Sequence, residues 1–236
     1  MKLVRLILKA PRAIQQPLRY AVGLIPPPIR YGRAFSETTA LLDRQEYWDR
    51  DQLLEYQSDC LRTLVHHAYE NVPYYRETWD RLGIIPTDIR TVHDIRKLPF
   101  LTKETIQTRT RDLIARNFAP SKLVYSTTGG STGIPLGFYE EAGVTQALER
   151  AFIAKQWQRV GYEVGDKTAV FRGTVVAGSD ADRLWEYNPM ERSLAFSSYH
   201  LTEDRIPRML EKLRSFSPLF IQAYPSSIYQ IAEFMR

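Results

Sequence analysis

The feature that most constrains the fold is an alternation of β-rich and helical segments between residue 123 and residue 236. Short β-rich runs are separated by stretches with the apolar spacing of amphipathic helices. We therefore predict an α/β fold with a mixed, partly parallel sheet and flanking helices. The β-rich runs read KLVYS, PLGFYE, DKTAVFRGTVVAG, RSLAFSSYHL and PLFIQAY, and the helical runs read EAGVTQALERAFIAKQWQRVGY, DRIPRMLEKLRSF and PSSIYQIAEFMR.

A mainly helical region precedes this part of the chain. Apolar residues recur at helical spacing from about 38 to 70, and a further short helix is expected to close near Gly83. Thr91 and Thr102 have the character of N-caps for two more helices. The prolines of LIPPPIRYGRAF cannot continue a helix, so we expect this piece to be extended.

Positive charge is concentrated at the start of the chain. Residues 1–36 carry seven cations and no acid, and the whole chain carries +5, so residues 37–236 carry a net charge of −2. A nucleic-acid-binding domain would place a basic stripe on its folded part, which this distribution does not provide. The first residues put apolar side chains on one helical face and cations opposite, as in a docking helix, a frayed arm, or a weak membrane-surface contact through residues 1–20.

Cysteine usage and hydropathy indicate the compartment. Cys60 is the only cysteine, so the chain can form neither an internal disulfide nor a cysteine zinc site. No run reaches the roughly 18 apolar residues of a membrane span. We expect a cytoplasmic location, peripheral to the membrane if residues 1–20 bind to its surface.

The uncharged stretch VYSTTGGSTGIPLGFY lies between two of the β-rich runs. Its glycines let the backbone approach a ligand closely, and its hydroxyl groups can donate to phosphate oxygens. It matches neither the P-loop, since no lysine follows the glycines, nor the dinucleotide pattern G-x-G-x-x-G. The residues alone leave a nucleotide loop, a plain hairpin and a mobile linker open. The phosphate-binding candidates are Ser126, Thr127, Thr128, Gly129, Gly130, Ser131, Thr132 and Gly133.

The same stretch resembles the phosphate-binding signature of the adenylate-forming enzymes, a hydroxyl-rich TSG-T/S-TG-x-P loop. The branch it resembles contains phenylacetate–coenzyme A ligase and the CapK-like proteins of capsular polysaccharide biosynthesis. Three further segments look like that branch in the same order, so the resemblance covers about residue 30 to the end: LVHHAYENVPYYRETW, DIRTVHDIRKLPFLTKETI and IQAYPSSIYQIAEF. Leu136 stands where many members of the wider superfamily have a lysine, which this branch often lacks.

The resemblance implies a two-step ligase reaction. A carboxylic acid reacts with Mg²⁺ and ATP to give an acyl-adenylate and pyrophosphate, and a thiol, usually coenzyme A, then takes the acyl group. Residues 126–133 would hold the β- and γ-phosphates. The chain would consist of a basic arm over 1–35 and a partial AMP-binding domain over 36–236, with a helical part over about 36–120 and an α/β part over about 121–236.

Several later motifs of that family are absent from these 236 residues. They are a glutamate that helps to hold Mg²⁺, an aspartate that binds the ribose and a lysine needed for adenylation. We therefore expect an N-terminal fragment without a complete catalytic cycle, completed by a C-terminal partner polypeptide if the gene is split. The alternatives are a catalytically inactive nucleotide-binding module and an interaction protein linked to surface polysaccharide biosynthesis.

Polar residues follow several of the predicted strands. Arg172 lies at a strand exit, which is the usual position of a site in open α/β sheets. Tyr224, Pro225 and Ser226 lie between a strand and a helix whose N-terminus could face a substrate, with Pro225 at the turn and Ser226 or its neighbour as the cap. These four residues are candidates for a substrate pocket. His200 follows another strand and fits a core or edge position, or a place in the acyl or adenine pocket. The sequence assigns no catalytic residue and no metal ligand.

Overall fold

The computed structural model of this chain describes residues 12–129, 133, 135–173 and 183–236. They form a mixed α/β structure, as predicted. The chain divides into two compact units, one made of Met1–Thr39 with Ala147–Arg236 and one made of Ala40–Gln146.

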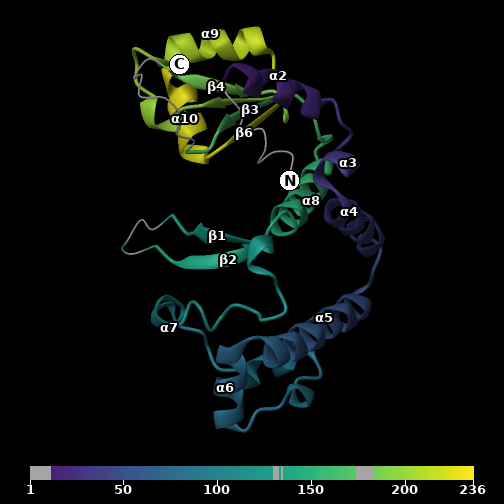
Figure 1. Cartoon of the computed structure of the whole chain (residues 1–236). Coiled ribbons are helices and arrows are strands. Elements are labelled where there is room, and N and C mark those ends of the chain that lie inside the picture. The colour runs from purple at the N-terminus through teal and green to yellow at the C-terminus, as the bar shows by residue number, and fades with distance from the viewer. Residues whose placement is uncertain (1–11, 130–132, 134, 174–182) are drawn as a thin grey trace. The chain divides into compact units, whose positions relative to one another are not determined.

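The described elements are labelled in Figure 1, where space allows, and follow one another in this order: α2 (Arg12–Gly23), α3 (Pro27–Tyr31), α4 (Arg33–Gln45), α5 (Arg50–Asn71), α6 (Pro73–Leu82), η1 (Pro86–Asp88), η2 (Val92–Lys97), α7 (Lys103–Thr108), η3 (Pro120–Lys122), β1 (Leu123–Thr127), β2 (Gly137–Glu141), α8 (Thr145–Gln158), β3 (Thr168–Phe171), β4 (Trp185–Asn188), β5 (Ser193–Phe196), η4 (Ser198–His200), α9 (Ile206–Phe216), β6 (Phe220–Ala223) and α10 (Pro225–Phe234).

Helices α5 and α6 are the main elements of the unit Ala40–Gln146. Asp49 and Gln52 form a reciprocal cap at the start of α5, with each side chain accepting a hydrogen bond from the other's backbone N–H at 2.9 and 3.0 Å. Gly83 ends α6 in the left-handed conformation at φ +68°, as the sequence predicted. The apolar faces of the two helices meet in a cluster whose buried members are Val65, Ala68, Trp79 and Ile89.

Both threonine N-caps lie where they were predicted. Thr102 begins α7, and its side chain accepts from the Thr105 backbone N–H at 3.1 Å. Thr91 begins η2, where Asp94 accepts from the Thr91 N–H at 2.9 Å. The Lys97 ammonium group, 2.8 Å away, and the backbone N–H groups of Thr91 and Arg90 hold the pKa of Asp94 well below its usual value.

The other unit contains a four-stranded sheet in the order β4-β5-β3-β6. Strand β3 pairs in parallel with both β5 and β6, and β4 pairs antiparallel with β5. The predicted partly parallel sheet is therefore confirmed. β4 was not predicted, and it extends the sheet on the β5 side.

One face of this sheet forms the core beneath α9 and α10. The Phe171 and Phe196 rings are fully buried and stack at 4.5 Å between centroids with 3° between planes. Met209 of α9 and Ile231 of α10 join the same cluster. Burial of one such side chain contributes about 1.5–3 kcal/mol, so this face is the main source of stability for the sheet.

The predicted extended course of the proline run is wrong, because α3 begins at Pro27 and runs to Tyr31. Proline is tolerated in the first helical turn, where its missing N–H would have no intrahelical partner. Pro26 is the residue before the helix, so all three prolines lie at positions that a helix accepts.

The arm is packed against its own unit over the residues that are described. Val22 of α2 is buried, and the Tyr20 and Tyr187 rings lie 6.0 Å apart. The predicted docking helix or frayed arm concerned the apolar face of the first ten residues, which lie outside the described residues. Residues 1–11, which carry the rest of the predicted membrane contact, lie outside the described residues. None of the described helices is both long and apolar enough to cross a bilayer.

Candidate functional site

The glycine-rich stretch connects the two strands of an antiparallel hairpin. β1 and β2 pair from Leu123 opposite Glu141 to Thr127 opposite Gly137. This is the strand–loop–strand arrangement that the sequence predicted. Gly130, Ser131 and Thr132, three of the eight candidates, lie outside the described residues.

Thr128 closes the base of the loop from both its backbone and its side chain. Its N–H donates to the Leu136 carbonyl at 2.9 Å, and the Leu136 N–H donates to Thr128 Oγ1 at 3.0 Å. Because Oγ1 acts as an acceptor here, the hydroxyl hydrogen of Thr128 is free to donate to another group. The base of the loop is therefore closed by one backbone and one side-chain hydrogen bond, and the Thr128 hydroxyl still has a hydrogen to donate.

The described glycines of the loop are exposed and meet no neighbouring atoms. Gly133 has φ +147°, a backbone conformation that L-residues rarely adopt, and a Cβ at Gly129 or Gly133 would meet nothing within 4 Å. Glycine is therefore needed at Gly133 for its backbone conformation and not for space. An open backbone of this kind can turn its N–H groups toward an anion.

Gly137, where the loop returns to the hairpin, has a different reason to be glycine. A Cβ at this position would overlap the Tyr125 side chain. The Tyr125 ring packs edge-on against Tyr139 with 5.3 Å between centroids. The two tyrosines therefore lie on one face of the hairpin together with Thr127, whereas Ser126 lies on the opposite face.

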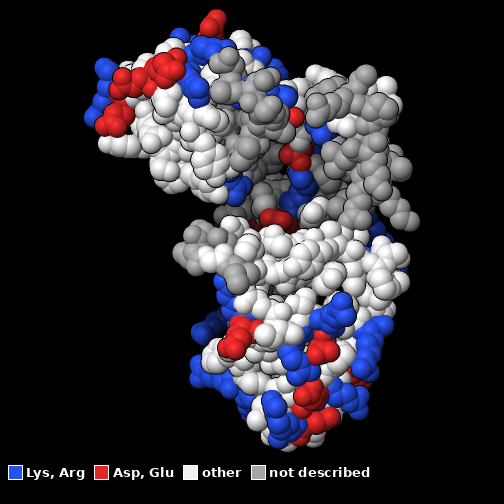
Figure 2. Space-filling view, turned by 60° about the vertical axis from the view of Figure 1, so that its left-hand side comes forward, with Lys and Arg blue, Asp and Glu red and all other residues white. Residues whose placement is uncertain are grey.

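No charged residue lies between Leu123 and Tyr139. Figure 2 agrees with this, since the band of surface around the hairpin is largely white and charged side chains gather over the helices of the same unit. An uncharged, hydroxyl-bearing loop suits a polyphosphate, because no carboxylate within it would repel the ligand.

A second set of candidates lies in the other unit, at the carboxyl ends of the parallel strands β3, β5 and β6. Arg172 directly follows β3, and its guanidinium lies 5.9 Å from the centre of the Tyr224 ring. The Tyr224 N–H donates to the Phe171 carbonyl at 3.0 Å. These contacts bring together two of the predicted pocket residues, which are 52 positions apart in the sequence numbering.

Two residues that were not predicted complete this strand edge. The Gly173 N–H donates to Ser198 Oγ at 3.1 Å, and a Cβ at Gly173 would lie 3.3 Å from the Tyr224 ring and 3.7 Å from the Tyr199 hydroxyl. Tyr199 is 70% exposed, so its ring is available to a ligand. Ser198 and Tyr199 follow the β5 run, the same signal that identified Arg172, and that signal could have found them.

His200 has a structural partner, which fits the core or edge position expected for it. Its Nδ1 lies 2.6 Å from Oγ of Ser197, and Ser197 is fully buried at the end of β5. This hydrogen bond holds the short turn η4 against the sheet. Tyr199 lies within η4, at the edge of the sheet where the strands end.

The cap of the last helix differs from the prediction. Tyr224 is the N-cap of α10 and Pro225 occupies its first turn, whereas Ser226 lies inside the helix and exposed. The predicted serine cap is wrong because the N-cap is Tyr224, two residues before Ser226, which puts Pro225 in the first helical turn, where proline needs no N–H partner. The described residues contain no cluster of three or more His, Cys, Asp or Glu side chains that could hold a metal ion.

Comparisons with known proteins find several curated relatives of this chain, although no protein-family model matches it. It is 25% identical to Protein CapK of Staphylococcus aureus over 187 residues. This match covers 78% of this chain and 41% of the relative. It is 28% identical to the phenylacetate-coenzyme A ligase of Pseudomonas putida over 198 residues. This match covers 82% of this chain and 43% of the relative. The chain thus spans about two-fifths of the length of these relatives.

Solved structures give the same fold. A 2-hydroxyisobutyryl-CoA ligase in complex with 2-HIB-AMP and CoA, in the thioesterification state, matches with a TM-score of 0.61 at 20% identity. The match covers 82% of this chain and 42% of that one. An open conformation of the same ligase matches with a TM-score of 0.53 at 19% identity. The predicted resemblance to phenylacetate-CoA ligases and CapK is confirmed by the curated relatives.

Proposed function

We propose that this chain, a relative of the phenylacetate-CoA ligases and of CapK, carries part of an acid–thiol ligase. The reaction would activate a carboxylic acid with ATP to an acyl-adenylate and then transfer the acyl group to coenzyme A or another thiol. The observation that carries the proposal is the uncharged glycine and hydroxyl loop, closed by Thr128 and Leu136 between two paired strands. The names of the relatives supply the reaction class.

The loop would hold the phosphates of ATP. Its exposed glycine backbone can approach phosphate oxygens, and the free hydroxyl hydrogen of Thr128 can donate to one of them. Phosphoryl chemistry of this kind depends on positioning and charge neutralisation more than on covalent help from the protein. We assign residues 126–133 to this role, as the sequence resemblance implies.

The strand edge with Arg172 and Tyr224 would form part of the pocket for the carboxylic acid. Tyr199 and Tyr224 offer exposed aromatic surface, and Arg172 offers a cation that attracts a carboxylate. Pro225 and Ser226 open α10 beside them, where a helix N-terminus favours negative charge. The phosphate loop and the acid pocket lie in different units, and each is proposed from the contacts within its own unit.

We infer that the full cycle requires polypeptide beyond these 236 residues. The chain spans about two-fifths of its relatives, and the described residues offer no carboxylate cluster for Mg²⁺. The ligand for Mg²⁺ would come from a C-terminal continuation or partner polypeptide. The domain division proposed from the sequence, an arm over 1–35 and a partial AMP-binding domain over 36–236, is part of this account.

The edge strand β6 supports a partner of this kind. β6 lies at one edge of the described sheet, and two apolar residues, Leu219 just before it and Ile221 within it, are 68% and 52% exposed. Phe234 and Met235, at the end of α10, are also exposed. An apolar, uncharged strand edge is normally covered in a native protein, so it suits an added strand.

A second candidate is an interaction protein linked to surface polysaccharide biosynthesis, docked through residues 1–20. Seven cations and no acid in residues 1–36 favour contact with an anionic surface. Deleting residues 1–20 and measuring binding to anionic liposomes tests it. Unchanged binding would exclude this candidate.

Exchange of labelled pyrophosphate into ATP, with a panel of aryl and small carboxylic acids, tests the ligase proposal. We expect this chain alone to bind Mg·ATP weakly without exchange, because only part of the site is present. Acid-dependent exchange should appear when a polypeptide with the missing glutamate and lysine is added. A chain that binds no Mg·ATP under any of these conditions would contradict the proposal.

A further inference from the structure

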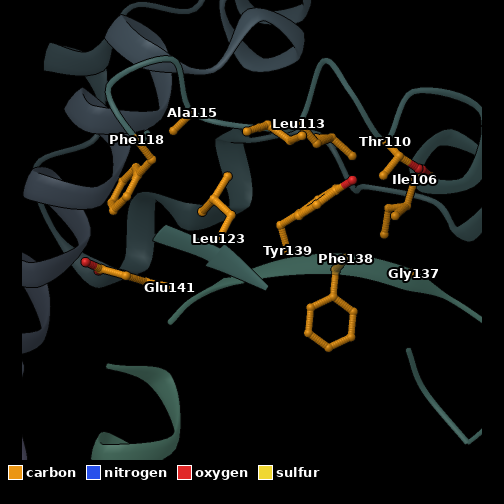
Figure 3. Close-up of a pocket in the computed structure, with 11 residues that line it drawn as sticks. Ile106, Thr110, Leu113, Ala115, Phe118, Leu123, Gly137, Phe138, Tyr139 and Glu141 are labelled. Atoms are coloured by element: carbon orange, nitrogen blue, oxygen red, sulfur yellow. The ribbon is translucent and has the colours of Figure 1, made fainter. Parts of the chain in front are cut away.

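An apolar cavity lies beneath the hairpin in the unit Ala40–Gln146, and the proposed reaction does not use it. It has a volume of about 290 Å³ and lies between one face of the hairpin and the segment that runs from α7 to β1 (Figure 3). This is near the lower end of the volumes that hold small ligands in proteins. It is about the space that one aromatic ring with a short side chain needs.

Backbone hydrogen bonds are formed along both walls of the cavity. On the segment side, the Arg116 N–H donates to the Asn71 carbonyl at 2.8 Å and the Tyr74 N–H donates to the Asp112 backbone carbonyl at 3.0 Å, which joins this wall to α5 and α6. On the hairpin side, the Ala142 N–H donates to the Lys122 carbonyl at 2.7 Å. The segment wall is therefore tied to α5 and α6, and the two ends of the hairpin wall are tied to each other.

The lining is apolar and aromatic. Leu113, Phe118, Leu123 and Tyr139 face the cavity, and all of them except Tyr139 are half-buried against it rather than part of a packed core cluster. The Phe118 ring is braced edge-on by His67, with 6.1 Å between centroids. Such a lining favours a planar apolar ligand body.

The two ends of the cavity have different polarity. Figure 3 shows Glu141 beside Phe118 at one end, and Tyr139 with Thr110 toward the other. Among the eleven lining residues Glu141 carries the only charge. It forms no ion pair with any residue that the structure describes, and the Tyr139 hydroxyl likewise has no hydrogen-bond partner among the described residues.

From this geometry we propose that the cavity binds a small organic ammonium compound with an aromatic body. The ring would lie among Leu113, Phe118 and Leu123, and the ammonium group would pair with the Glu141 carboxylate. The aromatic faces add to the attraction for a cation. The same carboxylate disfavours an acid of equal size, so this ligand class differs from the substrate of the proposed ligase reaction.

Three probes with the same ring and similar length test the proposal: 2-phenylethylamine, 2-phenylethanol and 3-phenylpropionate. Each is titrated into the whole chain by calorimetry, with backbone amide spectra to locate the site. The amine should bind about tenfold more tightly than the acid, as expected for one partly screened charge pair. The alcohol should lie between them, and the shifted amides should include residues 106–123.

Two variants and one control separate charge from shape. Glu141→Gln should bring amine binding close to that of the alcohol, whereas Glu140→Gln, on the opposite face of the hairpin, should leave the order of affinities unchanged. Leu113→Trp should fill the cavity and weaken all three probes. Equal binding of amine and acid by the wild-type chain, unchanged amine binding in Leu113→Trp, or no binding of the amine at all would overturn the proposal.

Discussion

Replacing Thr128 by valine tests how the loop is closed and what it holds. Valine keeps the branched shape but removes Oγ1, the acceptor 3.0 Å from the Leu136 N–H. The Thr128 N–H bond to the Leu136 carbonyl, at 2.9 Å, uses the backbone and stays. The change therefore deletes one of the two hydrogen bonds at the base of the loop.

The lost bond is worth about 1 kcal/mol, at the lower end if water reaches the freed N–H, since Thr128 is exposed and Leu136 only half-buried. Local opening of the loop should become about fivefold more frequent. Loss of the free hydroxyl donor removes one charge-assisted contact to phosphate, which weakens Mg·ATP binding by roughly tenfold or more.

The assay is amide hydrogen exchange at Leu136 combined with calorimetric titration of Mg·ATP. Thr128→Ser is the matched control, because it retains Oγ1 and should keep both exchange protection and affinity near the wild-type values. The reasoning is refuted if Thr128→Val exchanges at the wild-type rate and binds Mg·ATP with unchanged affinity. Equal losses in the serine and valine variants would also refute it, because the hydroxyl would then be irrelevant.

Three further changes test other parts of the account. Gly133→Ala introduces a Cβ with free space but unfavourable φ, so Mg·ATP affinity should fall while the thermal unfolding temperature changes little. Phe196→Ala removes the ring stacked on Phe171 and should cost about 3–5 kcal/mol in urea unfolding; a loss below about 1 kcal/mol would argue against a tightly packed sheet core. The lowered pKa of Asp94, caused first by Lys97, means that its stabilising contribution is present above the unfolded pKa of about 4 and is lost as pH falls. Asp94→Asn should therefore melt below the wild type at pH 7 and converge with it in strong acid, and a difference that is independent of pH would contradict this.

Much of the architecture follows from local sequence signals. The hairpin around the glycine loop, the parallel strands β3, β5 and β6, the stop at Gly83 and the cap at Thr102 each depend on residues close together in the chain. Local chemistry is sufficient at these places because turn residues and caps act within one turn of where they stand. The resemblance to known ligases likewise depended on contiguous motifs.

The sequence signals failed where tertiary context decides. β4 reads WEYN, an alternation of apolar and polar residues that spans only four positions, and all four residues are half-buried, so its strand character depends on pairing with β5. The proline run looked extended because its position relative to a helix start could not be known in advance. The strand-exit signal that identified Arg172 applies equally to Ser198 and Tyr199, but only the sheet shows that the β5 exit lies next to Gly173 and Tyr224.

The account rests most heavily on the claim that the loop between β1 and β2 binds the phosphates of ATP. Backbone amide spectra of the whole chain, recorded during a titration with Mg·ATP and again with Mg·AMP, test it directly. We predict that the amides of residues 126–133 shift with Mg·ATP and respond much less to Mg·AMP, because the loop holds the β- and γ-phosphates. Shifts confined to other residues, or loop amides that respond equally to both nucleotides, would contradict the claim.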